Sequence, residues 1–237
     1  MIVNFDLNAI GVFTGILAWS VIGFFAYQIY KKQMVKPKVW KILMAILVGL
    51  FSFSINWNMN ETMFRIPILP LGVWILYFFC KGKAGRWQTY RTFAWLGFLM
   101  NFVFLFLTLV SIPIYHMIYS ENEPSTYIST VENASIITIH PSAKNPTLKE
   151  EKLLKQLSSM SQEKIYSNQW YDDTYKNHEL IDRKERFPYQ LIGASPKWGS
   201  GLNTIIYIED DGKGILISTP KKQLYFRSEE SILERGE

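Results

Sequence analysis

Residues 9–30 contain no charged side chain and read AIGVFTGILAWSVIGFFAYQIY, followed directly by Lys31 and Lys32. At a rise of about 1.5 Å per residue, roughly 20 apolar residues cross the ~30 Å hydrocarbon layer of a bilayer. The stretch therefore predicts a first transmembrane helix over about 9–30. A cleaved signal peptide is the alternative, but it would carry bases before its apolar core, whereas here Asp6 precedes the core and the lysines follow it.

A second apolar region, residues 42–80, is too long for a single crossing. It is interrupted by the polar segment 56–62, and Arg65 follows shortly after. Because a charged residue at a helix centre costs roughly 2.5–3.5 kcal/mol on insertion scales, we expect this interruption to lie at a water interface. The pattern predicts two transmembrane helices, at about 40–57 and 63–80. A re-entrant hairpin is the alternative.

The fourth apolar segment, residues 92–118, has no ionisable side chain before His116 and is long enough to span a bilayer with tilt. The expected fold class is therefore an α-helical integral membrane bundle of four transmembrane helices, followed by a small α+β soluble domain. The membrane region is expected to occupy residues 1–119, and the soluble domain residues 120–237.

The loops indicate the orientation of the chain in the membrane. Residues 31–41 carry five lysines and residues 81–91 carry four bases, whereas the remaining connection has only Glu61 and Arg65 as charges. Loops rich in lysine and arginine stay in the cytoplasm. This predicts a multi-pass protein of the cell membrane, with both the N-terminus and residues 120–237 extracytoplasmic.

Charge is divided unevenly along the chain. Residues 1–120 hold two acids and ten bases (net +8), and residues 121–237 hold eighteen acids and fifteen bases (net −3), which together give the overall +5. The basic excess lies in short loops beside apolar segments, so membrane topology explains it and no nucleic-acid partner is expected. Cys80 is the only cysteine, which excludes an intrachain disulfide.

The second half shows the signals of a small α+β domain. Thr147 and Glu150 have the spacing of a capping box, which together with apolar periodicity predicts a helix over 148–166. An Asp-Gly pair at residues 211–212 predicts a hairpin turn, because glycine supplies the positive φ. The charged C-terminal tail is expected to fray. Strands are expected at residues 131–140, 189–193, 204–209, 215–218 and 223–227.

No arrangement of residues points to catalysis, a metal or another cofactor. His116, His140 and His178 are far apart and lack the spacing of a zinc site. We therefore expect no cofactor and do not favour an enzyme.

Two groups of side chains are candidate contact sites. The aromatic residues Trp170, Tyr171 and Trp198 are candidates for contact with a partner, with burial in the core as the alternative. A polar cluster at the outer membrane surface is expected from Glu61, Arg65 and His116.

The expected function is to present an extracytoplasmic domain that binds or regulates another membrane or envelope protein. One alternative is a transporter or channel subunit, and another is a membrane-bound enzyme that acts at the outer surface. The expected partners are the lipid bilayer and that second protein. Gly11 and Gly15 form a G-x-x-x-G pattern, which indicates close packing of the first helix either in a homo-oligomer or within the bundle.

Overall fold

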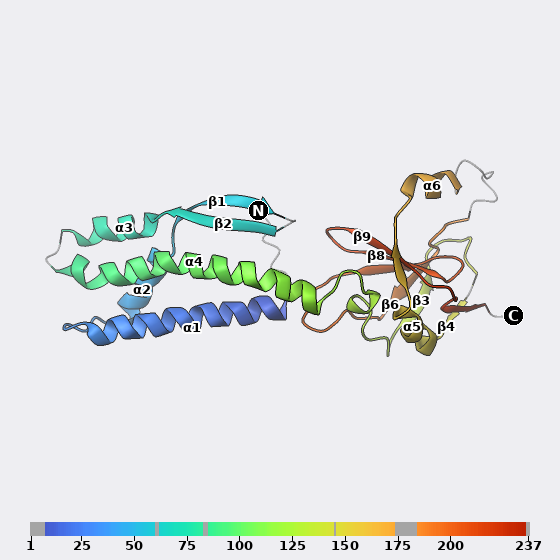
Figure 1. The fold of residues 1–237 in the computed structure, drawn as a ribbon, viewed down its shortest axis with the longest axis horizontal. Coiled ribbons are helices and arrows are strands. Elements are labelled where there is room, and N and C mark those ends of the chain that lie inside the picture. The colour runs from blue at the N-terminus through green and yellow to red at the C-terminus, as the bar shows by residue number, and fades with distance from the viewer. Residues whose placement is uncertain (1–7, 60–61, 83–84, 145, 174–183, 236–237) are drawn as a thin grey trace. The chain divides into compact units, whose positions relative to one another are not determined.

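A computed structural model describes residues 8–59, 62–82, 85–144, 146–173 and 184–235. The chain forms two compact units (Figure 1). The first, Ile10–Tyr115, is the helical unit. The second consists mainly of His116–Glu237 and is the sheet unit.

The helical unit contains two long apolar helices, α1 (Ala9–Lys32) and α4 (Arg86–Ile118). Both are long and apolar enough to cross a membrane, judged by length and composition. The helices predicted over 9–30 and 92–118 fall within them. In the most apolar window of each helix, 11% of the residues of α1 and 33% of those of α4 are buried inside the protein. Most of their apolar side chains therefore face outward.

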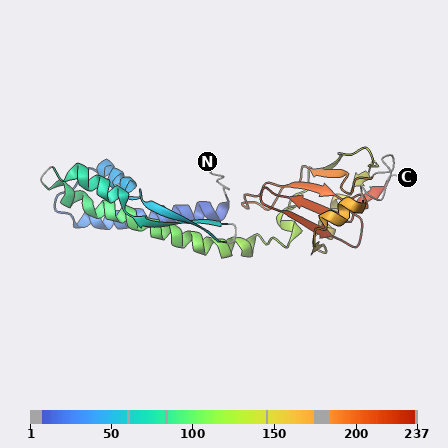
Figure 2. The ribbon, with the colours of Figure 1, turned by 90° about the horizontal axis from the view of Figure 1, so that it is seen from above.

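Between these helices lie two short helices and a β-hairpin. The chain passes through α2 (Val39–Gly49), β1 (Phe53–Met59), β2 (Thr62–Leu69) and α3 (Leu71–Cys80). β1 and β2 pair as antiparallel strands. The hairpin runs beside α4, as Figures 1 and 2 both show.

Four helical spans are therefore not formed. The helix predicted over 40–57 ends at Gly49, and the one predicted over 63–80 begins at Leu71. At 1.5 Å per residue, α2 and α3 are only about 17 and 15 Å long, roughly half the thickness of the hydrocarbon layer. Residues 39–80 instead form a short helix, two antiparallel strands and a second short helix, in that order.

Alternation of side chains explains why this region forms strands. Trp57 lies opposite Phe64, and Asn56 lies opposite Arg65, so neighbouring cross-strand pairs are alternately apolar and polar. A period of two favours an extended strand over a helix, and such cross-strand pairs stabilise a hairpin. Pro67 also fits an edge strand better than a helix interior.

Helices α2 and α4 approach closely at two glycines, Gly49 and Gly97. A Cβ atom added at Gly97 would lie 2.2 Å from the carbonyl oxygen of Ile46. Just beyond this contact, the Asn101 side chain donates a hydrogen bond of 3.1 Å to the carbonyl oxygen of Leu50, where α2 ends. Buried residues of α1, α2 and α4 form the core of the unit: Ile22, Ile42, Ala45, Ile46, Phe93, Leu96 and Met100.

The sheet unit is built on a six-stranded antiparallel sheet in the order β3-β6-β7-β8-β9-β5. These strands are β3 (Ser135–Thr138), β6 (Tyr189–Ile192), β7 (Ile205–Ile208), β8 (Gly214–Ser218), β9 (Gln223–Arg227) and β5 (Ser161–Glu163). A second, two-stranded sheet pairs β4 (Pro146–Leu148) with β10 (Leu233–Arg235). The helices are α5 (Glu150–Leu157), α6 (Ser167–Tyr171) and the 3-10 turn η1 (Pro124–Thr126).

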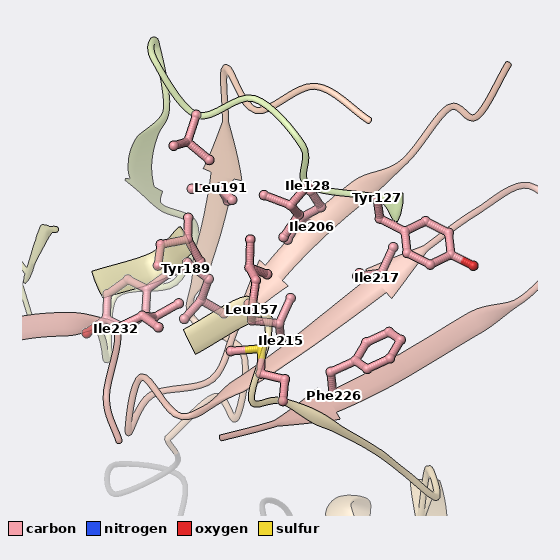
Figure 3. Packing of buried hydrophobic residues seen from close by; sticks show 14 of the residues in the cluster. Tyr127, Ile128, Leu157, Tyr189, Leu191, Ile206, Ile215, Ile217, Phe226 and Ile232 are labelled. Carbon is pink, nitrogen blue, oxygen red and sulfur yellow. The ribbon is translucent and has the colours of Figure 1, made fainter. Parts of the chain in front are cut away.

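One face of the large sheet forms the core, shown in Figure 3. Helix α5 supplies Leu153 and Leu157, which belong to the same buried cluster as alternate residues of the strands. The strand residues are Tyr189, Leu191, Ile206, Ile208, Ile215, Ile217, Leu224 and Phe226. The expected antiparallel strands are confirmed here. The predicted turn is also confirmed, because Gly212 has a φ of +72° and donates its N–H to the carbonyl oxygen of Glu209.

Three expectations for this half are wrong. The capping box does not form, because Lys149 precedes α5 without a side-chain capping hydrogen bond and Thr147 lies in β4. The helix predicted over 148–166 ends at Leu157, because the Ser158 and Ser159 hydroxyls bond back to carbonyl oxygens of its last turn and the chain then enters β5. Such side-chain bonds offer the backbone an alternative to continued helix. The charged tail does not fray before residue 235, since β10 pairs with β4.

Replacing Gly97 with Ala is expected to destabilise the helical unit by about 1–3 kcal/mol, because the added methyl overlaps the α2 backbone. Gly23→Ala is the matched control, since a Cβ there meets nothing within 4 Å. Resistance of the purified full chain to denaturation by sodium dodecyl sulfate measures the difference. Equal resistance of both variants would contradict the close α2–α4 contact.

Candidate functional site

The sheet of the sheet unit has two ends with different surroundings. The β6–β7 loop (193–204) and the β8–β9 turn (219–222) lie at one end, and the β7–β8 turn (209–213) lies at the other. Tyr119, which follows α4, donates its hydroxyl to the carbonyl oxygen of Trp198 at 3.0 Å. We call the end that carries Trp198 the tether end and the opposite end the distal end.

The distal end holds a cluster of charged side chains around one buried carboxylate, Glu209. Its Oε1 atom lies 2.7 Å from Nη2 of Arg186, and its Oε2 atom accepts hydrogen bonds from the Tyr225 hydroxyl, at 2.7 Å, and from Arg227. Arg227 also pairs with Asp211. These five residues form the distal cluster, in which strand β9 supplies two members and the β7–β8 turn supplies two.

Trp170 on α6 covers the distal cluster. The Arg186 guanidinium lies 4.4 Å from the centre of the Trp170 ring, which also contacts the rings of Phe187 at 5.4 Å and Tyr225 at 5.1 Å. Strand β8 approaches the Glu209 carboxylate at Gly214, where only glycine fits. A Cβ atom at Gly214 would lie 2.0 Å from Oε2 of Glu209. The carboxylate is therefore enclosed by charge and by packing.

The cluster changes the acidity of two of its members. Burial, and then the hydrogen bond to the Glu209 carboxylate, raise the pKa of Tyr225 above its usual value. Burial alone would lower the pKa of Arg227, but its hydrogen bond with Tyr225 and the charge of Glu209 outweigh this effect and raise that pKa. The raised pKa keeps the Tyr225 hydroxyl protonated, so that it donates its hydrogen bond to Glu209.

The chemistry of the distal cluster is that of a structural clamp. Glu209 is occupied by three donors, and the described residues of the cluster include no activated nucleophile. Within the described ranges, no group of three or more histidine, cysteine, aspartate or glutamate side chains is placed to hold a metal ion. A carboxylate held by two arginines fixes the geometry of the strand end instead.

A polar groove of about 970 Å³ adjoins the cluster, and Arg227 belongs to both. Three cationic and three carboxylate side chains line it, together with four neutral polar ones. Small-molecule pockets are mostly apolar, so this lining suits the charged surface of a macromolecule better. The lining residues are Lys155, Gln156, Ser159, Ser161, Glu163, Lys213, Arg227, Ser228, Glu229 and Glu230.

The predicted aromatic contact residues do not form one patch. Trp170 is half-buried in the distal cluster, so for this residue the packing alternative applies. Its neighbour Tyr171 is 57% exposed, and Trp198 is 88% exposed at the tether end. Trp198 and the two α6 residues, Trp170 and Tyr171, therefore lie at opposite ends of the strands.

The predicted outer polar cluster stays a prediction. Glu61 lies outside the described residues, Arg65 lies on β2 of the helical unit, and His116 belongs to the sheet unit. The role of the first-helix glycines in a homo-oligomer is likewise untested. A Cβ at Gly15 meets nothing within 4 Å, so this glycine does not serve a close contact within the described part of the chain.

Sequence reasoning missed the distal cluster and the groove. Arg186, Glu209 and Arg227 are separated by about twenty residues each, and only the strand register brings them together. The one available signal was a pair of charged residues at strand ends, namely Glu209 just before the Asp-Gly turn and Arg227 at the end of the strand predicted over 223–227.

Comparison of the chain with protein-family models, with curated proteins and with solved structures gives no match.

Replacing Glu209 with Gln is expected to destabilise the sheet unit by about 3 kcal/mol, because it leaves two arginines without their shared counter-charge. Glu234→Gln is the matched control: Glu234 pairs with two lysines at the surface, so its loss should leave the melting temperature unchanged. Thermal unfolding of the full chain, followed by the circular dichroism of the sheet, measures both. Equal melting temperatures would show that the cluster does not stabilise the fold.

The raised pKa of Tyr225 predicts a pH-dependent stability. A pKa that is higher in the folded state favours the neutral form, so this contribution is complete below about pH 10 and is lost as the pH rises through the folded pKa. Tyr225→Phe should be less stable than the wild type at neutral pH and should approach it above pH 10. Melting temperatures between pH 7 and 11 measure the gap, and Tyr166→Phe serves as the control for an exposed tyrosine.

Proposed function

We propose that this chain is a multi-pass membrane protein that presents its sheet unit outside the cytoplasm, where the polar groove at the distal end binds a protein of the membrane or envelope. The observation that carries the proposal is the groove itself. It is lined by both signs of charge and lies at the end of the sheet opposite Tyr119, the residue that follows α4.

Exposed apolar side chains support the membrane assignment. In α1, the side chains of Phe13, Ile16 and Phe24 are 68%, 62% and 58% exposed. Soluble proteins rarely expose contiguous apolar surface of this extent, whereas lipid covers it without cost. Ile22 of α1 belongs to the same buried cluster as residues of α2 and α4, which favours a permanent part of the bundle over a removable signal peptide.

The out-and-back excursion of residues 39–80 supports the proposed orientation. Strands β1 and β2 are antiparallel, so the chain returns toward its starting level through α3. The basic loops that precede α2 and follow α3 then lie on the same side. Because such loops are retained in the cytoplasm, the end of α4 and the sheet unit are assigned to the opposite side.

The lining of the groove supports a protein partner. Within the described ranges, Lys155 and Lys213 make no ion pair, and they stand beside the carboxylates Glu229 and Glu230. A surface of mixed sign recognises a partner by complementary charges, which contribute chiefly to specificity and to the rate of association. The edge strand β5 borders the groove and pairs on one side only in the described sheet, so it also offers backbone hydrogen bonds to an extended segment.

Cysteine labelling in intact cells tests the compartment. In a Cys80→Ser background, a cysteine that replaces Glu229 should react with a membrane-impermeant maleimide in intact cells. A cysteine that replaces Gln88, an exposed residue in the first turn of α4 next to the loop assigned to the cytoplasm, should react only after permeabilisation. The reverse pattern would overturn the extracytoplasmic assignment.

The same Glu229 position tests binding. A cross-linker attached there should give a discrete cross-linked species in intact cells, and the double variant Lys155→Glu, Lys213→Glu should weaken it several-fold. Lys221→Glu at the tether end is the matched control and should leave it unchanged. If the double lysine variant gave the same amount of cross-linked species as the wild type, the groove would be refuted as the binding site.

A further inference from the structure

The β6–β7 loop exposes Trp198 almost completely, at 88% of its surface. Tryptophan is usually largely buried because its ring is large and apolar. Hydrogen bonds nevertheless fix the backbone around it. The Lys197 N–H donates to the carbonyl oxygen of Thr126 at 3.0 Å, and the Ser200 N–H donates to the carbonyl oxygen of Lys197 at 3.1 Å. Gly199 adopts a φ of +75°, a conformation that other residues rarely take. A fixed loop therefore presents a free indole ring.

This loop is bonded to the residues at which α4 ends. The Tyr119 hydroxyl donates to the carbonyl oxygen of Trp198 at 3.0 Å, and the Lys197 ammonium donates to the carbonyl oxygen of Ile118 at 3.0 Å. Met117, in the last turn of α4, is 84% exposed, and Ile118 is 44% exposed. Exposed apolar side chains thus continue from the end of the helix to the loop.

We propose that Trp198 inserts into the headgroup layer of the bilayer and, together with Lys197, holds the tether end of the sheet unit against the membrane surface. The partner of this loop is a lipid surface. This inference rests on the proposed membrane crossing by α4, but it does not depend on which side the sheet unit occupies.

The depth of the loop supports this choice of partner. The polar layers of a bilayer add roughly 5–8 Å on each side of the ~30 Å hydrocarbon. The apolar stretch of α4, residues 92–118, is about 40 Å long, so with the usual tilt of a spanning helix it ends in this layer. The Trp198 carbonyl oxygen is hydrogen-bonded to the side chain of Tyr119, the residue that follows α4, so the loop is within reach of the same layer. Tryptophan is enriched there, because its ring is apolar while its N–H finds polar partners. Lysine is suited to the phosphates of the same layer.

Depth-dependent quenching in reconstituted liposomes tests the proposal on the full chain. In a Cys80→Ser background, an environment-sensitive dye on Trp198→Cys should be quenched several-fold more by nitroxides attached to lipid headgroups than the same dye on Tyr171→Cys. Tyr171 is the matched control because it is an exposed aromatic residue next to the distal cluster. Equal, weak quenching at both positions would overturn the proposal.

A second measurement keeps the native side chain. The fluorescence of the wild type minus that of Trp198→Phe isolates this tryptophan from the other seven. Bromine atoms near the lipid headgroups should quench the difference signal more than bromine atoms near the bilayer centre. If the signal is quenched by neither, yet Trp198 is protected from modification in cells, the loop contacts a protein and the lipid assignment is wrong.

Extraction with alkaline carbonate separates this inference from the proposed function. A chain that remains in the membrane pellet but shows no quenching at position 198 would refute the lipid contact and leave the membrane crossing intact. A chain that is released into the supernatant would refute the crossing itself.

Discussion

The helical unit depends on the contact between α2 and α4, where Gly49 and Gly97 allow two backbones to approach without intervening side chains. The contact lies where α2 ends. The last carbonyl oxygens of α2, which lack a hydrogen-bond donor within the helix, therefore lie next to α4. Asn101 donates to one of them, at Leu50. Nearby, the Gly72 N–H donates to the Phe51 carbonyl oxygen at 2.7 Å, so the start of α3 is tied to the end of α2. In apolar surroundings, a helix can end only where other groups of the protein form hydrogen bonds with its free carbonyl and N–H groups.

The same demand limits where the β-hairpin can lie in the proposed membrane arrangement. The strands pair with each other, and no further strand is added to them in the described residues. An open sheet edge is not tolerated in contact with lipid hydrocarbon, because its N–H and C=O groups find no partners. Pro67 removes one N–H from the β2 edge. The β1 edge, which contains Ser54 and Asn56, must therefore face water or protein, and the polar pair of Asn56 and Arg65 suits that environment.

The parts predictable from sequence were those governed by local patterns. Long apolar runs predicted α1 and α4, and the Asp-Gly turn at 211–212 predicted the β7–β8 hairpin. The hairpin of β1 and β2 was missed although its period-two alternation was visible, because the apolar length of residues 42–80 favoured helical crossings. The length of an apolar stretch indicates how much apolar surface must be removed from water. It does not determine whether the backbone of that stretch is helical or extended.

The candidate sites could not be predicted because they depend on distant contacts. Glu209 looks like an ordinary turn residue in the sequence, yet strand pairing surrounds it with two arginines and a tyrosine. Trp170 and Trp198 looked equivalent as exposed aromatics. The sheet register places them at opposite ends, one packed over a charged cluster and the other exposed beside the end of α4.

The distal end of the sheet combines a structural cluster with the groove that we propose binds a partner. Arg227 holds Glu209 and also lines the groove, so a partner that competes for this guanidinium would disturb the fold. Lys155 and Lys213 line the same groove from α5 and from the β7–β8 turn, outside the distal cluster. The proposed binding through these lysines would use charges that make no ion pair within the described residues. Under the proposed function, substitutions of these lysines would change the specificity of the groove while the distal cluster keeps the strand ends in place. At Arg227, which belongs to both the groove and the cluster, the two roles would conflict.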